Sequence, residues 1–124
     1  MPYHFDNTQP IYLQIIRLIQ LNIASGRWVP GERIPAVREL AVQFGVNPNT
    51  VQRSLSELER EGLLYSERTS GRFITKDVHR IQTIRNQMAQ EYILQFVKNM
   101  LELGVSPQRI VSMLEEEVAK HHEQ

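Results

Sequence analysis

The stretch PAVRELAVQFGVNPNTVQRSLSELEREG, residues 35–62, contains two helical patterns joined by a Gly-Val turn. The first pattern covers 35–44. The second begins with Asn47 as a cap and Pro48 at the first helical position, and it ends at Gly62. Two short helices separated by so few residues are typical of a helix-turn-helix. The apolar residues expected to face inward are Val37, Leu40, Ala41 and Phe44 in the first helix and Val51, Leu55 and Leu58 in the second.

A longer amphipathic helix is predicted upstream, over residues 11–24, and Gly26 is suited to end it. Its apolar side would give the two shorter helices a surface to pack against. The residues that recur with the helical period on this side are Tyr12, Ile15, Ile16, Ile19 and Ile23.

Downstream, residues 63–66 and 72–75 predict two short strands, with Gly71 suited to the turn between them. Ile34 should be extended because it precedes a proline, and we expect it to add a one-residue bridge to this hairpin. Three helices followed by a β-hairpin make a winged helix-turn-helix. We therefore predict a mostly α fold that starts with a winged helix-turn-helix domain over 9–77.

The rest of the chain, residues 78–124, is predicted to be a two-helix dimerisation region, with a long helix over 78–103 and a second helix starting at Ser106 and Pro107. From Met88 onward the long helix is apolar on more than one face, and the second helix can cover only one of them. An uncovered apolar row usually marks an interface, and the simplest partner is a second copy of the chain. Packing of the row on the N-terminal domain is the alternative. The expected dimer interface consists of Ile84, Met88, Tyr92, Phe96 and Met100.

Composition excludes several classes of protein. The 124 residues are 41% hydrophobic, too apolar for a disordered chain, yet they contain no run of about 18–20 apolar residues that could cross a membrane. The N-terminus does not resemble a signal peptide, and the chain has no cysteine, so the expected location is a reducing cytoplasm. With 14 Lys+Arg and 14 Asp+Glu the net charge is zero, so binding of nucleic acid would need a local basic face.

No sequence pattern points to catalysis. The chain lacks the HExxH, GxSxG, P-loop and GxGxxG patterns. The acidic run 115–117 points in different directions on a helix, and the pair His121–His122 is most simply a solvated pair. We expect no enzyme activity, no cofactor and no metal site, with weak adventitious metal binding by the histidines left open.

Residues 11–75 resemble the DNA-binding domain of the GntR family of bacterial transcription regulators. The resemblance is carried by PGERIP at 30–35, by RELA at 38–41 with the Gly-Val pair that follows, and by Thr50–Val51 with the Glu-Gly-Leu at 61–63. Their order and spacing make the resemblance specific.

The segment NPNTV at 47–51 resembles a variant found in the YtrA-like branch of that family, and the length of 77–124 suits the two C-terminal helices that the branch implies. Two positions depart from the family pattern. Ala36 stands where Ser is frequent, and Thr69–Gly71 stands where the wing usually reads Gly-x-Gly with a basic middle residue. Two arginines flank this wing tip instead.

The resemblance implies a sequence-specific DNA-binding regulator. The predicted homodimer would bind an inverted repeat in double-stranded DNA, and repression is favoured because a bound dimer can block polymerase. On the second helix of the motif, Arg53 suits a guanine in the major groove, and Gln52 or Asn49 suits an adenine. By resemblance, Arg38 contacts a phosphate and the wing arginines contact phosphates or the minor groove. The predicted DNA-binding residues are Arg38, Asn47, Asn49, Thr50, Gln52, Arg53, Arg68, Ser70 and Arg72.

Other interpretations stay open at this stage. The polar side of the second helix could be only a solvated face, and Arg38 could pair with Glu39 or Glu32. The wing arginines could serve solubility alone. At the level of function, the alternatives are a winged-helix module that binds protein and a regulator that senses a small ligand in the dimer groove. The sequence does not identify a small-molecule effector and predicts no membrane partner.

Overall fold

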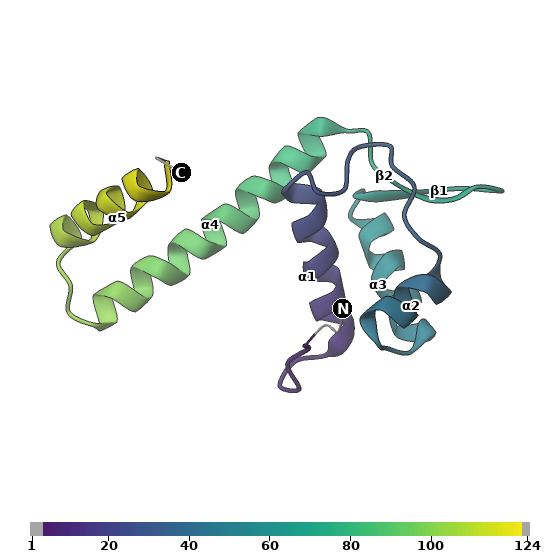
Figure 1. Cartoon of the computed structure of the whole chain (residues 1–124), viewed down its shortest axis with the longest axis horizontal. Helices are drawn as coiled ribbons and strands as arrows, with labels where there is room; N and C mark the ends of the chain where they lie inside the picture. The colour runs from purple at the N-terminus through teal and green to yellow at the C-terminus, as the bar shows by residue number, and fades with distance from the viewer. Residues whose placement is uncertain (1–3, 123–124) are drawn as a thin grey trace. The chain divides into compact units, whose positions relative to one another are not determined.

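The computed structural model describes residues 4–122 and has the mostly helical winged helix-turn-helix arrangement predicted from the sequence (Figure 1). The chain forms two compact units whose boundary lies inside α4, between Arg85 and Asn86. The first turns of α4 therefore belong to the first unit. The elements in chain order are α1 (Ile11–Ala24), α2 (Val37–Phe44), α3 (Pro48–Arg60), β1 (Leu64–Glu67), β2 (Gly71–Ile74), α4 (Val78–Glu102) and α5 (Pro107–His122).

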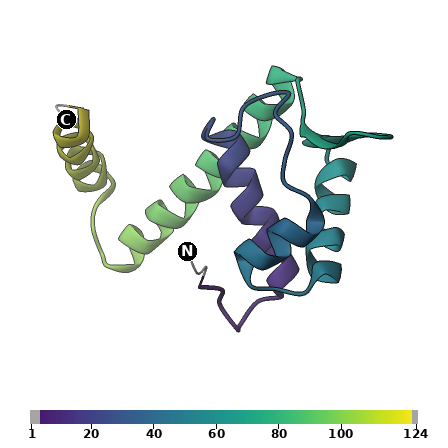
Figure 2. The ribbon, with the colours of Figure 1, turned by 45° about the vertical axis from the view of Figure 1, so that its right-hand side comes forward.

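The first unit is built around α3, which packs against α1, α2 and β1 (Figure 2). Ser54 on α3 is fully buried, and its hydroxyl lies 3.1 Å from the carbonyl oxygen of Tyr12 and 2.9 Å from that of Thr50, so this polar group has acceptors inside the core. The helices and the hairpin close a single apolar core. Its fully buried large side chains are Ile15, Ile19, Ile23, Leu40, Val51, Leu55, Leu58, Leu63 and Ile74.

The hairpin is antiparallel, with Leu64 paired to Ile74 at its base and Glu67 paired to Gly71 at its tip. Gly71 has a φ of +104°, as the turn prediction required. The loop before α2 runs beside β2 and joins it through an isolated bridge between Arg33 and Phe73.

The bridge to the hairpin thus exists, although it is centred one residue before the predicted position. Ile34 still contributes, because its N–H donates to the carbonyl of Arg72 at 3.0 Å while its side chain is buried. Two further backbone hydrogen bonds, from Gly31 to Ile74 and from Ile74 to Glu32, hold the same loop. The loop before α2 and the wing are therefore one structural element.

The second unit consists of α4 from Asn86 onward and α5. The two helices are joined at Gly104, whose φ of +83° suits glycine, and Pro107 begins α5 as predicted. Within residues 86–122, the large apolar side chains that are buried are Met88 and Ile110. No helix in residues 4–122 has the length and apolar character needed to cross a bilayer.

Candidate nucleic-acid interface

The N-terminal end of α3 is fixed by a cap. The side-chain oxygen of Asn47 accepts the backbone N–H of Asn49 at 2.7 Å, as its predicted capping role requires. Gly45 ends α2 in the left-handed conformation, and the N–H of Val46 then donates to the carbonyl of Ala41. The turn is held on both sides, which fixes the direction in which α3 leaves α2.

The first half of α3 has a polar, exposed side opposite the side that is locked into the core. The exposed side chains are Asn49, Gln52 and Arg53, and Thr50 beside them is half-buried. One turn later the hydroxyl of Ser56 accepts a hydrogen bond from the Gln52 amide at 3.4 Å. The structure therefore brings together on one surface the three side chains that were predicted to read bases, with Thr50, another predicted DNA-binding residue, beside them.

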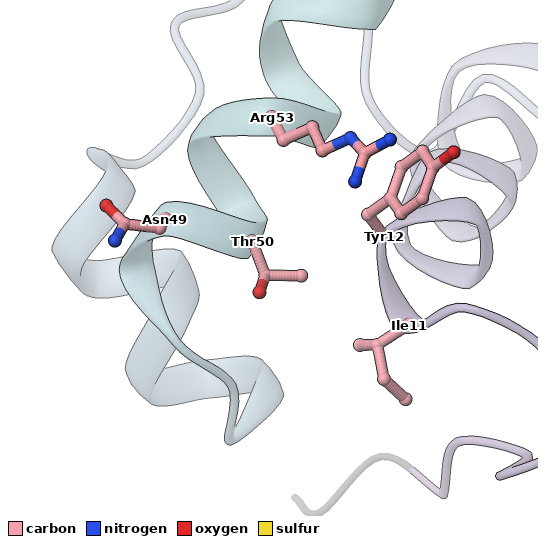
Figure 3. Close-up of a pocket in the computed structure, with 5 residues that line it drawn as sticks. All are labelled: Ile11, Tyr12, Asn49, Thr50 and Arg53. Carbon is pink, nitrogen blue, oxygen red and sulfur yellow. The ribbon is translucent and has the colours of Figure 1, made fainter.

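Arg53 lies against α1. Its guanidinium carbon is 3.6 Å from the centroid of the Tyr12 ring, a cation–π contact (Figure 3). Both residues, with Ile11, Asn49 and Thr50, line an open hollow of about 310 Å³. Sequence reasoning placed Tyr12 in the core and missed this contact. The available signal was an aromatic ring with a polar tip in the first turn of an amphipathic helix.

Arg38 is exposed on α2. No ion pair joins it to any residue in the described part of the chain, so pairing with Glu39 or Glu32 is not observed there. Arg38 also lines an open hollow of about 430 Å³ with Gly45 and Pro48 at the α2–α3 turn. Its charged end is thus accessible next to the N-terminus of α3.

The two wing arginines differ in their surroundings. Arg68 lies in the exposed turn with Ser70, whereas Arg72 is turned toward α3, where its Nε is 2.6 Å from Oε1 of Glu59. The Arg72 side chain is only 20% exposed. Sequence reasoning did not identify this ion pair. It ties the wing to α3 and leaves Arg72 less accessible than Arg68.

Glu59 receives a second hydrogen bond, from the hydroxyl of Ser66 on β1. Partial burial acts to raise the pKa of Glu59, but the hydrogen bonds from Ser66 and Arg72 and the charge of Arg72 act the other way. The net result is a pKa below the usual range of a glutamate. The carboxylate is therefore ionised when it holds the wing.

The predicted dimer surface is only partly accessible. Ile84 and Met88 are 6% and 3% exposed, so the chain itself covers them and they offer almost no surface to a second copy. Helical periodicity aligns these two residues with Tyr92 but does not reveal what covers them, so their place in a dimer interface stays a prediction. Tyr92 is 54% exposed, and Phe96 and Met100 are partly exposed. The accessible part of the row therefore lies beyond Met88.

The model of the family described as bacterial regulatory proteins, gntR family, matches residues 11–74. The uncharacterized HTH-type transcriptional regulator YhcF of Bacillus subtilis is 37% identical over 111 residues, which cover 90% of this chain and 92% of YhcF. The HTH-type transcriptional repressor YtrA of the same organism is 41% identical over 71 residues, which cover 57% of this chain and 55% of YtrA. The similarity to YhcF thus extends through most of both chains.

Solved structures of similar proteins also include members of the GntR family. A GntR family transcriptional regulator from Listeria monocytogenes is similar with a TM-score of 0.83 and 35% identity, covering 90% of this chain and 98% of that one. The structure of AraR(DBD) in complex with operator ORX1 is similar with a TM-score of 0.56 and 30% identity, covering 60% of this chain and 95% of that one. Part of the arrangement described above, amounting to 60% of this chain, therefore occurs in a protein that was crystallised with operator DNA.

Proposed function

The chain belongs to the GntR family of bacterial regulatory proteins, and on that premise we propose that it is a repressor that binds an inverted-repeat operator as a homodimer. The observation that carries this proposal is the polar, exposed side of α3, which starts at a capped N-terminus and displays Asn49, Gln52 and Arg53 together. The major groove admits a helix, and its base edges carry a distinct pattern of donors and acceptors for each base pair.

In this proposal α3 enters the major groove with its N-terminal half, the usual direction for recognition helices. Arg53 binds a guanine with two hydrogen bonds, and Gln52 or Asn49 binds an adenine. Thr50 lies at the same surface. The phosphate contacts around this site come from Arg38, Asn47, Arg68 and Ser70, with Arg72 in a smaller part because Glu59 already holds it.

The proposed dimer forms through the second unit. Its helices leave many large apolar side chains exposed, and a second copy related by a two-fold axis can cover them. Two winged helix-turn-helix units would then address half-sites separated by a whole number of helical turns. The exposed apolar residues of this unit include Tyr92, Ile93, Leu94, Leu101, Leu103, Val111, Leu114 and Val118.

Repression is the direction we propose, since a bound dimer can block access of polymerase to a promoter. YtrA and the similar NagR of Bacillus subtilis are both named transcriptional repressors. The 41% identity to YtrA also supports a place in the YtrA-like branch. A regulator that binds chromosomal DNA in a bacterium works in the cytoplasm, which is the location we propose.

The test is selection of duplexes from a random pool with the purified full chain at physiological salt. We expect enrichment of one inverted repeat. As a matched control, the Gln52→Ala variant should fold and bind DNA but enrich a pool that is degenerate at one position of each half-site. Failure of the wild type to enrich any sequence, with no salt-dependent affinity for duplexes, would overturn the proposal and favour a module that binds protein.

A further inference from the structure

The loop that precedes α2 sends an arginine to the tip of the wing. Nε of Arg33 donates a hydrogen bond to the carbonyl oxygen of Ser70 at 2.7 Å. The guanidinium group also lies against Gly71, because a Cβ added to this glycine would come within 3.2 Å of Nε of Arg33. Arg33 therefore reaches the turn between β1 and β2 from outside the hairpin.

The backbone of Arg33 is held in place beside the hairpin. Arg33 bridges Phe73 on β2, and the next residue, Ile34, donates its N–H to the carbonyl of Arg72. These contacts fix where the side chain starts, and the hydrogen bond to Ser70 fixes where it ends. The guanidinium position is thus determined by the fold and is not a free rotamer of a surface residue.

The charge of Arg33 is not neutralised within the described residues. No ion pair joins Arg33 to a carboxylate in residues 4–122, and Arg33 is exposed to solvent. Arg72 contrasts with it, because Glu59 takes the charge of Arg72 and only 20% of that side chain is exposed. Of these two arginines beside the wing, Arg33 is the exposed one.

We propose that Arg33 is a DNA-backbone contact and supplies the cation that the tip sequence Thr69–Gly71 lacks. Its Nε holds the turn through Ser70, and its terminal nitrogens bind a phosphate oxygen. An arginine suits this double task because the guanidinium offers five N–H donors in a fixed fork, so that one is used inside the protein while others face an anion. The inference rests on the proposed DNA-binding function and adds a contact residue to it.

The experiment measures the salt dependence of operator binding by fluorescence anisotropy for the full chain and for the variants Arg33→Gln and Arg33→Lys. Each neutralised phosphate contributes about 0.9 to the slope of log K against log salt, so losing Arg33 from both copies should make the slope shallower by about 1.8. Arg33→Lys keeps the charge and should keep the wild-type slope. A role confined to holding the turn predicts instead that both variants lose affinity with no change of slope, which overturns the proposal.

Arg27→Gln is the matched control. Arg27 is an exposed residue of the same loop whose side chain has no hydrogen bond or ion pair with a described residue, so this variant removes the same charge away from the turn. Its slope should equal that of the wild type. If the wild type shows no salt-dependent affinity for any duplex, the proposed function fails and this inference fails with it. If the wild type binds but Arg33→Gln has the same salt slope, only the Arg33 contact fails.

A folding defect in Arg33→Gln would be seen in its thermal unfolding curve. In that case the measurement is made on the wild type, by NMR of the side-chain Nε–Hε group of Arg33. The signal is assigned by comparison with Arg33→Lys, whose spectrum lacks it. We expect this signal to shift when operator DNA is added. A signal that stays in place at saturation would overturn the contact.

Discussion

The two units of the chain treat apolar side chains in opposite ways. In the first unit nine large aliphatic residues form a fully buried core, although Leu13 and Val42 are exposed, and the buried hydroxyl of Ser54 has acceptors. In residues 86–122, Met88 and Ile110 are buried, whereas Leu94 and Leu103 are 68% and 77% exposed. The first unit therefore closes an apolar core, whereas most large aliphatic side chains of residues 86–122 are exposed.

This difference suggests that the first unit is stabilised by its own core, whereas the second unit is stabilised by association with a second chain. The first unit has the closed core that an independently folding domain needs, although it is small. The second unit has the composition of a core without the burial, and such a surface on a monomer marks an interface. The proposed division of labour follows, with DNA contacts on the first unit and pairing on the second.

The largest expected effect is a loss of folding stability, and it is tested by a Leu→Ala substitution made in each unit separately. Leu55→Ala removes a fully buried side chain of α3 and should lower the free energy of unfolding by about 2–5 kcal/mol. Leu101→Ala removes a side chain that is 50% exposed, and it should leave the unfolding of the first unit within about 0.5 kcal/mol of wild type. Trp28, the single tryptophan, lies in the first unit, so its fluorescence during urea unfolding reports on that unit. Equal losses in the two variants would contradict the separation.

The second expected effect concerns the pairing surface. Phe96→Glu places a carboxylate in the proposed apolar interface, where an unpaired charge is costly, and should raise the dimer dissociation constant at least 100-fold, about 2.7 kcal/mol. Sedimentation equilibrium measures the change in mass. Lys98→Glu is the control, because it introduces the same side chain at an exposed position of the same helix and should leave the mass unchanged. An undiminished mass for Phe96→Glu would move the interface to the neighbouring row that contains Ile93 and Leu101.

The contrast in burial between the two units also explains which parts of the fold and of the site could be predicted from the sequence. Periodicity, the Asn47 cap and the glycines located every helix and both strands closely, because local physical rules set those features. Periodicity could not separate Ile84 and Met88 from Tyr92, since all lie on one stripe and burial depends on which neighbours cover each turn. Contacts between distant segments were missed for the same reason, as with Tyr12 under Arg53 and Glu59 beside Arg72.

The third prediction tests the proposed reading surface of the first unit. Arg53→Ala should weaken operator binding by about 1–3 kcal/mol and relax discrimination at one base position of each half-site, without changing the mass of the dimer. Arg60→Ala is the control from the other end of α3, where the arginine is 78% exposed and paired with Glu57. Selection experiments with both variants measure the effect. An equal loss on all sequences would make Arg53 a phosphate contact and transfer base recognition to Gln52 and Asn49.

The smallest expected effect is the pH dependence of the tie between the wing and α3. The pKa of Glu59 is lowered in the folded chain, so its ionised form stabilises the fold at a pH above the usual glutamate range, and this contribution disappears as the pH falls through the lowered pKa. Glu59→Gln should therefore be less stable than wild type near neutral pH, by no more than about 1 kcal/mol because the pair is partly exposed, and the difference should vanish in acid. Glu117→Gln, which removes the exposed carboxylate that Lys120 and His121 approach on α5, should leave the Trp28 unfolding transition unchanged at every pH. A pH-independent difference for Glu59→Gln would mean that the carboxylate acts through packing alone, whereas a pH-dependent one would show that its negative charge, held by Arg72 and Ser66, stabilises the tie between the wing and α3.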